Sequence, residues 1–117
     1  MNILYCGYIR EQRFIGGIHH YLDYDYRLIQ EVKEPFSCLD NINALVFVGK
    51  QKNIFREHQE YYDFLYAARN KKIPVIAILE EDVTLPGSNR DIDKVIERSR
   101  EKKTLEDIAY ELRKFLG

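Results

Sequence analysis

The chain has 117 residues, 18 Lys and Arg, 19 Asp and Glu, and a formal net charge of -1. This length suits one domain with its own hydrophobic core, and the balanced charge argues against nucleic acid and acidic membranes as partners. Cys6 and Cys38 cannot form a disulfide framework. The sequence shows no signal-peptide pattern and no apolar run near the roughly 20 residues of a membrane span. We therefore predict a single cytoplasmic domain over residues 1–117.

The first third of the chain predicts a strand, a loop and a helix. Residues 3–6 are a short apolar run closed by a glycine, which indicates a buried strand. Paired glycines within residues 9–18 are typical of a turning backbone, so we expect a loop there. From residue 20 the apolar residues recur at helical intervals. Pro35 should end this helix, because the residue before a proline resists the helical conformation.

The middle of the chain predicts two further strands and a long helix. We expect irregular chain near residue 36 and one turn around residues 39–43. Residues 44–48 are a continuous β-prone run, as expected for a strand buried on both faces. A long helix should cover residues 55–69, and residues 73–79 form the third clear strand.

The last quarter of the chain predicts two helices. Residues 91–99 can form a short helix that uses Ile92, Val95 and Ile96. The final helix is predicted to begin after Thr104, with Asp107 three residues later in a variant of the capping box. An apolar stripe follows at helical spacing to the end of the chain.

Alternating strands and helices predict a parallel sheet with helices on both faces, an α/β fold of three layers. Ligands of such folds bind beyond the carboxyl ends of the strands. This rule selects residues 7–17, 49–55 and 80–87 as the segments around a site.

Several familiar sites are absent from these segments. The sequence has neither GxGxxG nor GxxxxGK[ST], the glycine-rich phosphate-binding motifs. A three-aspartate phosphoacceptor pocket is also excluded, because no acidic pair follows the first strand and Gly49 stands where the central strand would need an aspartate. The histidines His19, His20 and His58 lack the spacing of a zinc site, so we predict no metal site.

Charged residues near these strand ends are candidates for chemistry. Glu60 and Asp63 lie one helical turn apart, on a face that can look into the crevice. A carboxylate there can stabilise a ribosyl cation or attack the sugar, although the helix dipole by itself also favours acids in a first turn. Four cations lie on two of the crevice loops and can hold a phosphate, namely Arg10, Arg13, Lys50 and Lys52. Four cations on two loops also arise by chance in a chain with 18 of them.

Residues 40–79 resemble the middle of small bacterial and archaeal TIR-like (Toll/interleukin-1 receptor-like) proteins. The shared pattern is an aspartate, an apolar strand, a glycine, a polar loop, a helix ending in alanines, and a lysine before an X-Pro apolar strand. A later Leu-Pro pair and an Asp-Ile step in the last helix also fit. The matching residues are Asp40, 44–48, Gly49, Ala67, Ala68, 72–76, Leu85, Pro86 and 105–108.

This resemblance implies a three-layer flavodoxin-like/TIR-like fold with a short parallel sheet. It implies cleavage of NAD, or binding of an ADP-ribose-type nucleotide, in signalling or antiviral defence. The implied catalytic residue is Glu60, or Asp63 by its distance from the alanines. The implied nucleotide-binding residues are Tyr8, Arg10, Gly49 and Lys50. No cofactor is expected, and NAD is the candidate substrate.

Two alternatives stay open. One is a non-catalytic TIR-like module that assembles through its helices, with itself or with a partner protein. The other is an enzyme of N-glycosidic bonds similar to nucleoside deoxyribosyltransferases, which also use a glutamate on a helix.

Overall fold

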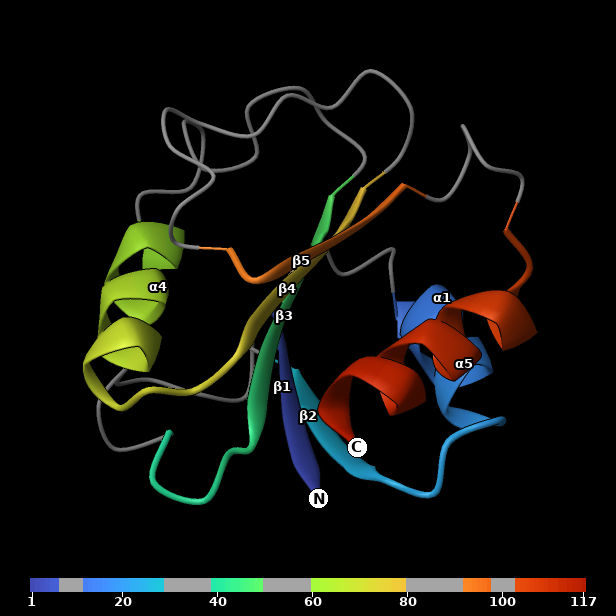
Figure 1. The fold of residues 1–117 in the computed structure, drawn as a ribbon, viewed down its shortest axis with the longest axis horizontal. Coiled ribbons are helices and arrows are strands. Elements are labelled where there is room, and N and C mark those ends of the chain that lie inside the picture. Colours follow the sequence, from blue (N-terminus) through green and yellow to red (C-terminus); the bar gives the residue numbers. More distant parts are fainter. Residues whose placement is uncertain (7–11, 29–38, 50–59, 80–91, 98–102) are drawn as a thin grey trace.

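The computed structural model describes residues 1–6, 12–28, 39–49, 60–79, 92–97 and 103–117. Within them, five parallel strands form one sheet in the order β2-β1-β3-β4-β5 (Figure 1). The strands are β1 (Asn2–Cys6), β2 (Asp25–Leu28), β3 (Ala44–Gly49), β4 (Val75–Leu79) and β5 (Lys94–Glu97). The helices are α1 (Gln12–His19), α4 (Glu60–Asn70) and α5 (Leu105–Leu116).

Helices cover both faces of the sheet. Figure 1 shows α4 on one face and α1 beside α5 on the other. Side chains along a strand alternate between the faces, and β1 divides accordingly. Leu4 and Cys6 belong to the core on the α4 side, whereas Ile3 and Tyr5 belong to the core beneath α1 and α5. The predicted three-layer α/β fold with a parallel sheet is therefore confirmed.

The sequence prediction of a loop over residues 9–18 is wrong for its described part, which is helix α1. The reason is the packing of two helices. A Cβ atom added to Gly17 would lie 2.5 Å from Cδ1 of Leu105 on α5. Glycine at this position therefore lets α1 and α5 approach closely. Glycines serve close packing as well as turns, so the pair does not by itself indicate a loop. Ile15 and Ile18 complete the contact by burying their side chains in the core below.

The helix predicted from residue 20 is also wrong, because strand β2 occupies Asp25–Leu28. It pairs in parallel with β1, with Asn2 opposite Asp25. The Asp25 N–H donates to the Met1 carbonyl at 3.0 Å. Residues 29–35, the second half of the predicted helix, lie outside the described residues.

The short helix predicted for residues 91–99 is wrong as well, because residues 94–97 form strand β5. Its ladder runs along β4, with Ile78 opposite Ile96. Ile96 is buried in the core beneath α1 and α5. A short apolar segment can form a helix or a strand. Here, pairing with the edge of β4 stabilises the strand.

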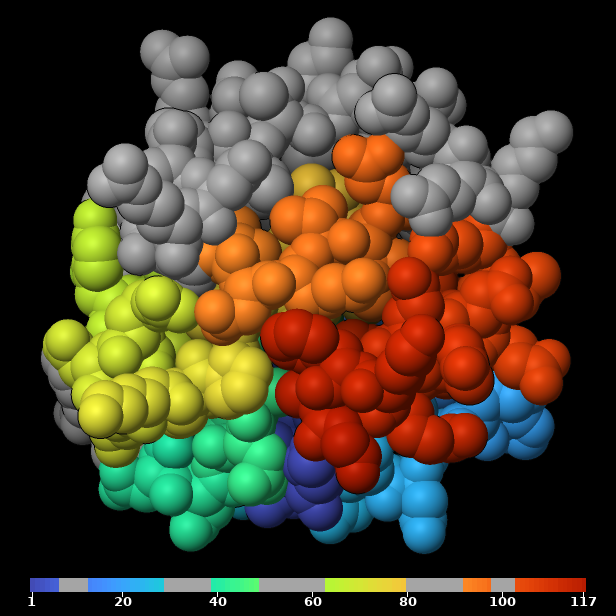
Figure 2. All heavy atoms as spheres, viewed as in Figure 1, coloured from blue at the N-terminus to red at the C-terminus, as the bar shows by residue number. Residues whose placement is uncertain are grey.

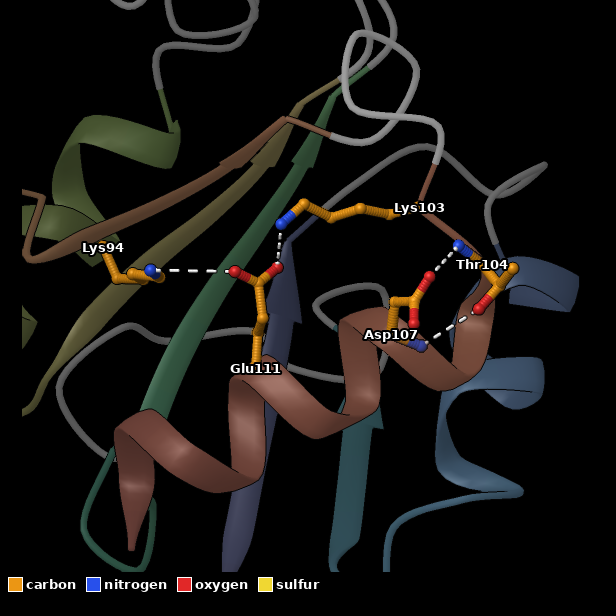
Figure 3. Close-up of polar contacts among 5 residues, drawn as sticks. All are labelled: Lys94, Lys103, Thr104, Asp107 and Glu111. Carbon is orange, nitrogen blue, oxygen red and sulfur yellow. Dashed lines mark hydrogen bonds and ion pairs between the residues drawn. The ribbon is translucent and has the colours of Figure 1, made fainter.

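The remaining element predictions that fall on described residues are confirmed. The Ile42 N–H donates to the Leu39 carbonyl in the predicted turn. Thr104 caps α5, since its hydroxyl accepts from the Asp107 N–H at 3.1 Å and its own N–H donates to Asp107 Oδ2 at 3.0 Å (Figure 3). The hydrogen bond from the Thr104 backbone is the main reason why the pKa of Asp107 lies below its usual value. The expected start of the helix at residue 55 lies outside the described residues.

None of the helices within the described ranges is long and apolar enough to cross a membrane.

The glycines of α1 offer a matched pair of substitutions. A Cβ at Gly16 would meet the Tyr26 hydroxyl at 3.8 Å, an ordinary contact. We expect Gly16→Ala to raise the free energy of unfolding by about 0.5–1 kcal/mol, the usual difference between alanine and glycine inside a helix. Gly17→Ala should gain less, because Leu105 must move to make room. Urea denaturation of both variants measures the difference, and a larger gain for Gly17→Ala would contradict the proposed contact between α1 and α5.

Candidate functional site

The carboxyl ends of the parallel strands lie along one edge of the sheet, where the sequence analysis predicts the site. Gly49 ends β3 and pairs with Leu79, the last residue of β4, and Leu79 pairs with Glu97 at the end of β5. Cys6 ends β1 and is buried. Among the described strand ends, Glu97 is the only carboxylate. A side chain that could accept or bind a charged group is thus missing from the end of the central strand.

The predicted site residues are only partly described. Gly49 lies at the carboxyl edge, as expected. Glu60 is the first residue of α4, and Asp63 lies one turn later with its side chain exposed. Tyr8, Arg10 and Lys50 lie outside the described residues. Their assignment to a ligand site therefore stays a prediction.

Glu111 of α5 forms a charged cluster that sequence reasoning missed. Its Oε2 accepts from Lys103 Nζ at 2.5 Å, and its Oε1 lies 3.8 Å from Lys94 Nζ (Figure 3). One carboxylate thus connects strand β5, the segment before α5, and the middle of α5. Lys103 and Glu111 are eight positions apart, beyond the three- and four-residue spacings that reveal helical pairs. Lys94 lies in a segment whose apolar spacing predicts a helix, so its position on a strand beside Glu111 is not evident from the sequence.

A second polar cluster lies at the opposite edge, where β4 and β5 begin. Asp93 Oδ1 accepts from Arg69 Nη1 at 3.2 Å, and its Oδ2 accepts from the Val75 N–H at 2.8 Å. The Asp93 N–H donates in turn to the Val75 carbonyl at 2.8 Å. Asp93 therefore fixes the end of α4 to the first residues of β4. These residues border an open groove of about 570 Å³ lined by Arg69, Lys72, Ile73, Pro74, Asp93 and Phe115.

Lys72 has an unusual backbone conformation in this groove. Its φ is 58°, in the left-handed region that residues other than glycine rarely adopt. The Lys72 N–H donates to the Arg69 carbonyl, and the Ile73 N–H donates to the Ala68 carbonyl. This pair of hydrogen bonds is the Schellman motif, which ends helices and normally places glycine at the left-handed position. This chain has a lysine at that position, so the sequence does not predict the motif.

Lys72→Gly should raise the free energy of unfolding by about 0.5–1 kcal/mol. The left-handed conformation costs an L residue about 1–2 kcal/mol, and the larger entropy of an unfolded glycine offsets part of the gain. Asn70→Gly is the control, because Asn70 belongs to the last turn of α4 and should lose stability instead. Urea denaturation compares them, and equal losses in both variants would contradict a strained Lys72.

A partly buried hydrogen bond joins Tyr5 of β1 to His19 of α1. The Tyr5 hydroxyl lies 2.6 Å from His19 Nε2, and His19 Nδ1 lies 3.1 Å from the Tyr24 carbonyl. A carbonyl only accepts, so Nδ1 carries the proton. In the neutral ring Nε2 is then the acceptor, and Tyr5 donates to it. Tyr26 of β2 stacks on the same imidazole with ring centroids 4.3 Å apart.

This arrangement favours the neutral forms of both side chains. Burial raises the pKa of Tyr5 above its usual value, with a smaller contribution from Tyr26. Burial lowers the pKa of His19, and the hydrogen bond to the Tyr24 carbonyl opposes that effect. Protonation of Nε2 would also remove the acceptor that Tyr5 uses. The pair suits a structural link between the sheet and α1.

The stability of the fold should therefore decrease as the pH falls below about 6.5, the ordinary pKa of histidine. Below that value the unfolded chain takes up a proton that native His19 resists, so protonation stabilises the unfolded state. Urea denaturation between about pH 7.5 and about pH 5.5 measures the slope. His19→Gln should flatten it, and the control His20→Gln, at an exposed neighbour, should keep it. Equal slopes in the wild type and His19→Gln would contradict this assignment.

The chain matches no family model and no curated protein. Among solved structures, it is similar to the crystal structure of a response regulator receiver domain protein (CheY-like) from Methanospirillum hungatei JF-1. The TM-score is 0.59 at 10% sequence identity, and the match covers 99% of this chain and 94% of that chain. The fold is flavodoxin-like. This confirms the fold class predicted from the sequence.

The predicted resemblance to TIR-like proteins is wrong, because the structural match is to a CheY-like receiver domain. The NAD nucleosidase activity, the nucleotide signalling role and the antiviral role inferred from it are withdrawn for the same reason. Neither the TIR-like assembly module nor the deoxyribosyltransferase-like enzyme is supported. The matched pattern of apolar runs, a glycine after a strand and an X-Pro strand start is what a buried parallel sheet requires. It therefore carried information on the fold and none on the chemistry.

Within the described ranges, no group of three His, Cys, Asp or Glu residues is placed to hold a metal ion.

Proposed function

We propose that the chain is a receiver-like signalling domain of the cytoplasm that acts by binding a partner protein. We further propose that it takes no phosphoryl group at the end of its central strand. The observation that carries the proposal is a receiver-like fold over 99% of the chain with Gly49 as the last residue of β3.

Glycine at this position bears directly on the chemistry. An aspartyl phosphate needs a carboxylate at the end of the central strand, and Gly49 has no side chain. Glu97, the carboxylate among the described strand ends, belongs to β5, two strands away. At about 4.8 Å per strand, this places its backbone roughly 10 Å from that of Gly49. Glu97 therefore does not replace the missing group.

Side chains on α5 support an output through protein contact. Tyr110 and Phe115 are large and mostly apolar, yet they are 61% and 40% exposed. The buried side of the same helix is formed by Ile108, Ala109 and Leu112. Exposed aromatic side chains are enriched at protein interfaces, because they bury a large area at a small entropy cost. A binding role uses these features without a reaction at the sheet edge.

The chemical part of the proposal is tested with a small phosphodonor. The purified chain is incubated with acetyl phosphate and Mg²⁺, and intact-mass spectrometry follows any acid-labile phosphoryl adduct. We expect no adduct, while an aspartate-containing receiver domain treated in parallel should acquire one. An adduct on this chain would overturn the proposal. Glu97→Gln would then show whether the β5 carboxylate had accepted the group.

A further inference from the structure

We propose that the groove between α4, β5 and α5 is the docking site for an acidic segment of a partner protein that also presents a large apolar side chain. This inference rests on the proposed function, since it assigns the surface and the partner chemistry of a receiver-like binding domain. The groove borders the starts of β4 and β5, so it lies at the edge of the sheet opposite to Gly49.

Three elements far apart in the sequence form this surface. Figure 2 shows β5 between α4 and α5, with the yellow segment that leads from α4 into β4 beside α5 below it. Arg69 lies in the last turn of α4, and Lys72 follows two residues after the helix ends. Asp93 precedes β5, and Phe115 lies in the last turn of α5. A volume of about 570 Å³ is enough for a few side chains of a bound peptide.

The charges of the groove favour an anionic partner. Both carboxylate oxygens of Asp93 are already occupied, one by Arg69 and the other by the Val75 N–H. The ammonium group of Lys72 has no ion pair or hydrogen bond among the described residues. Within the described ranges, one positive charge is therefore left without a counter-charge at an accessible position. A carboxylate of a partner complements it, whereas a basic segment would meet both cations.

The apolar part of the groove favours a mixed segment over a purely acidic one. Phe115 is 40% exposed and lines the groove together with Ile73 and Pro74. Ile73 is already buried, so a large apolar side chain of the partner would mainly remove Phe115 and Pro74 from water. The adjacent carboxylate would reach Lys72. Binding energy at interfaces concentrates in such aromatic anchors, with charges at the rim setting specificity.

The strained backbone of Lys72 is an independent argument for a role of its charge. Glycine would end α4 through the same hydrogen bonds without the cost of the left-handed conformation. The helix end does not require this lysine for its dipole either, because Lys71 supplies a cation and pairs with Asp40. Strain of this kind is typical of functional positions. A lysine that costs stability here is explained by what it binds.

A random peptide array tests the inference with the intact chain. We expect bound peptides to be enriched in Asp or Glu beside Phe, Leu, Ile or Tyr. The strongest peptide, labelled with a fluorophore, should lose affinity on the order of tenfold against Lys72→Glu and lose affinity against Phe115→Ala. Lys72→Gly should bind more weakly although it folds more stably. Arg27→Glu, an exposed charge reversal on strand β2, is the matched control and should bind like the wild type.

Several outcomes would overturn the docking site. They are an array without acidic binders, enrichment of basic or neutral peptides, and equal affinity for the wild type and Lys72→Glu. Self-association in sedimentation that disappears in Lys72→Glu would also overturn it, in favour of a second copy of this chain. The phosphodonor experiment tests the carboxyl edge of the sheet, whereas the peptide experiment tests the amino edge. Failure of the docking site is therefore distinguishable from failure of the proposed function. An aspartyl adduct with intact peptide binding would reject only the proposed function.

Discussion

Strands β1, β3 and β4 lie in the interior of the sheet and have helices over both faces, so their side chains must be apolar on both sides. This requirement explains why β4 is buried at every position and why β1 divides its side chains between two cores. It also determines where polar chemistry can lie. Charged groups are absent from the buried positions of these three strands and lie near the strand ends, on the edge strands β2 and β5, and on the outer sides of the helices.

The two edges of the sheet differ in the charged groups that they present. At the carboxyl edge, the end of the central strand is Gly49, which cannot bind or accept a charged group. At the amino edge, Asp93 fixes Arg69 and the first residue of β4. Lys72 has a costly backbone conformation there, and its charge has no partner in the part of the chain that the structure describes. A flavodoxin-like fold places most of its chemistry beyond the carboxyl ends of the strands. The described residues of this chain instead gather their ordered charges at the amino edge and around Glu111.

The residue pattern that resembles TIR-like proteins has a general physical origin. Apolar runs that end in glycine, followed by helices rich in small residues, satisfy the burial constraint of any parallel sheet with short connections. The fold match to the receiver domain holds at only 10% identity, so the architecture does not depend on a shared sequence. Such a pattern therefore identifies the architecture, whereas function depends on single residues at the edges. Gly49 was the informative residue of this kind, because its lack of a side chain excludes an aspartyl phosphate there.

Local sequence determined the elements whose signal is complete within one segment. These are the apolar runs of β1, β3 and β4 and the capped helix α5, where Thr104 and Asp107 are three residues apart. Tertiary structure decided the rest. The sequence predicts a turn at Gly17, but the packing of Leu105 against it makes this residue part of a helix. It also predicts a helix for the segment of β5, but pairing with β4 makes that segment a strand. The groove and the Glu111 cluster join residues from separate elements, so their charges meet only when the sheet brings those elements together.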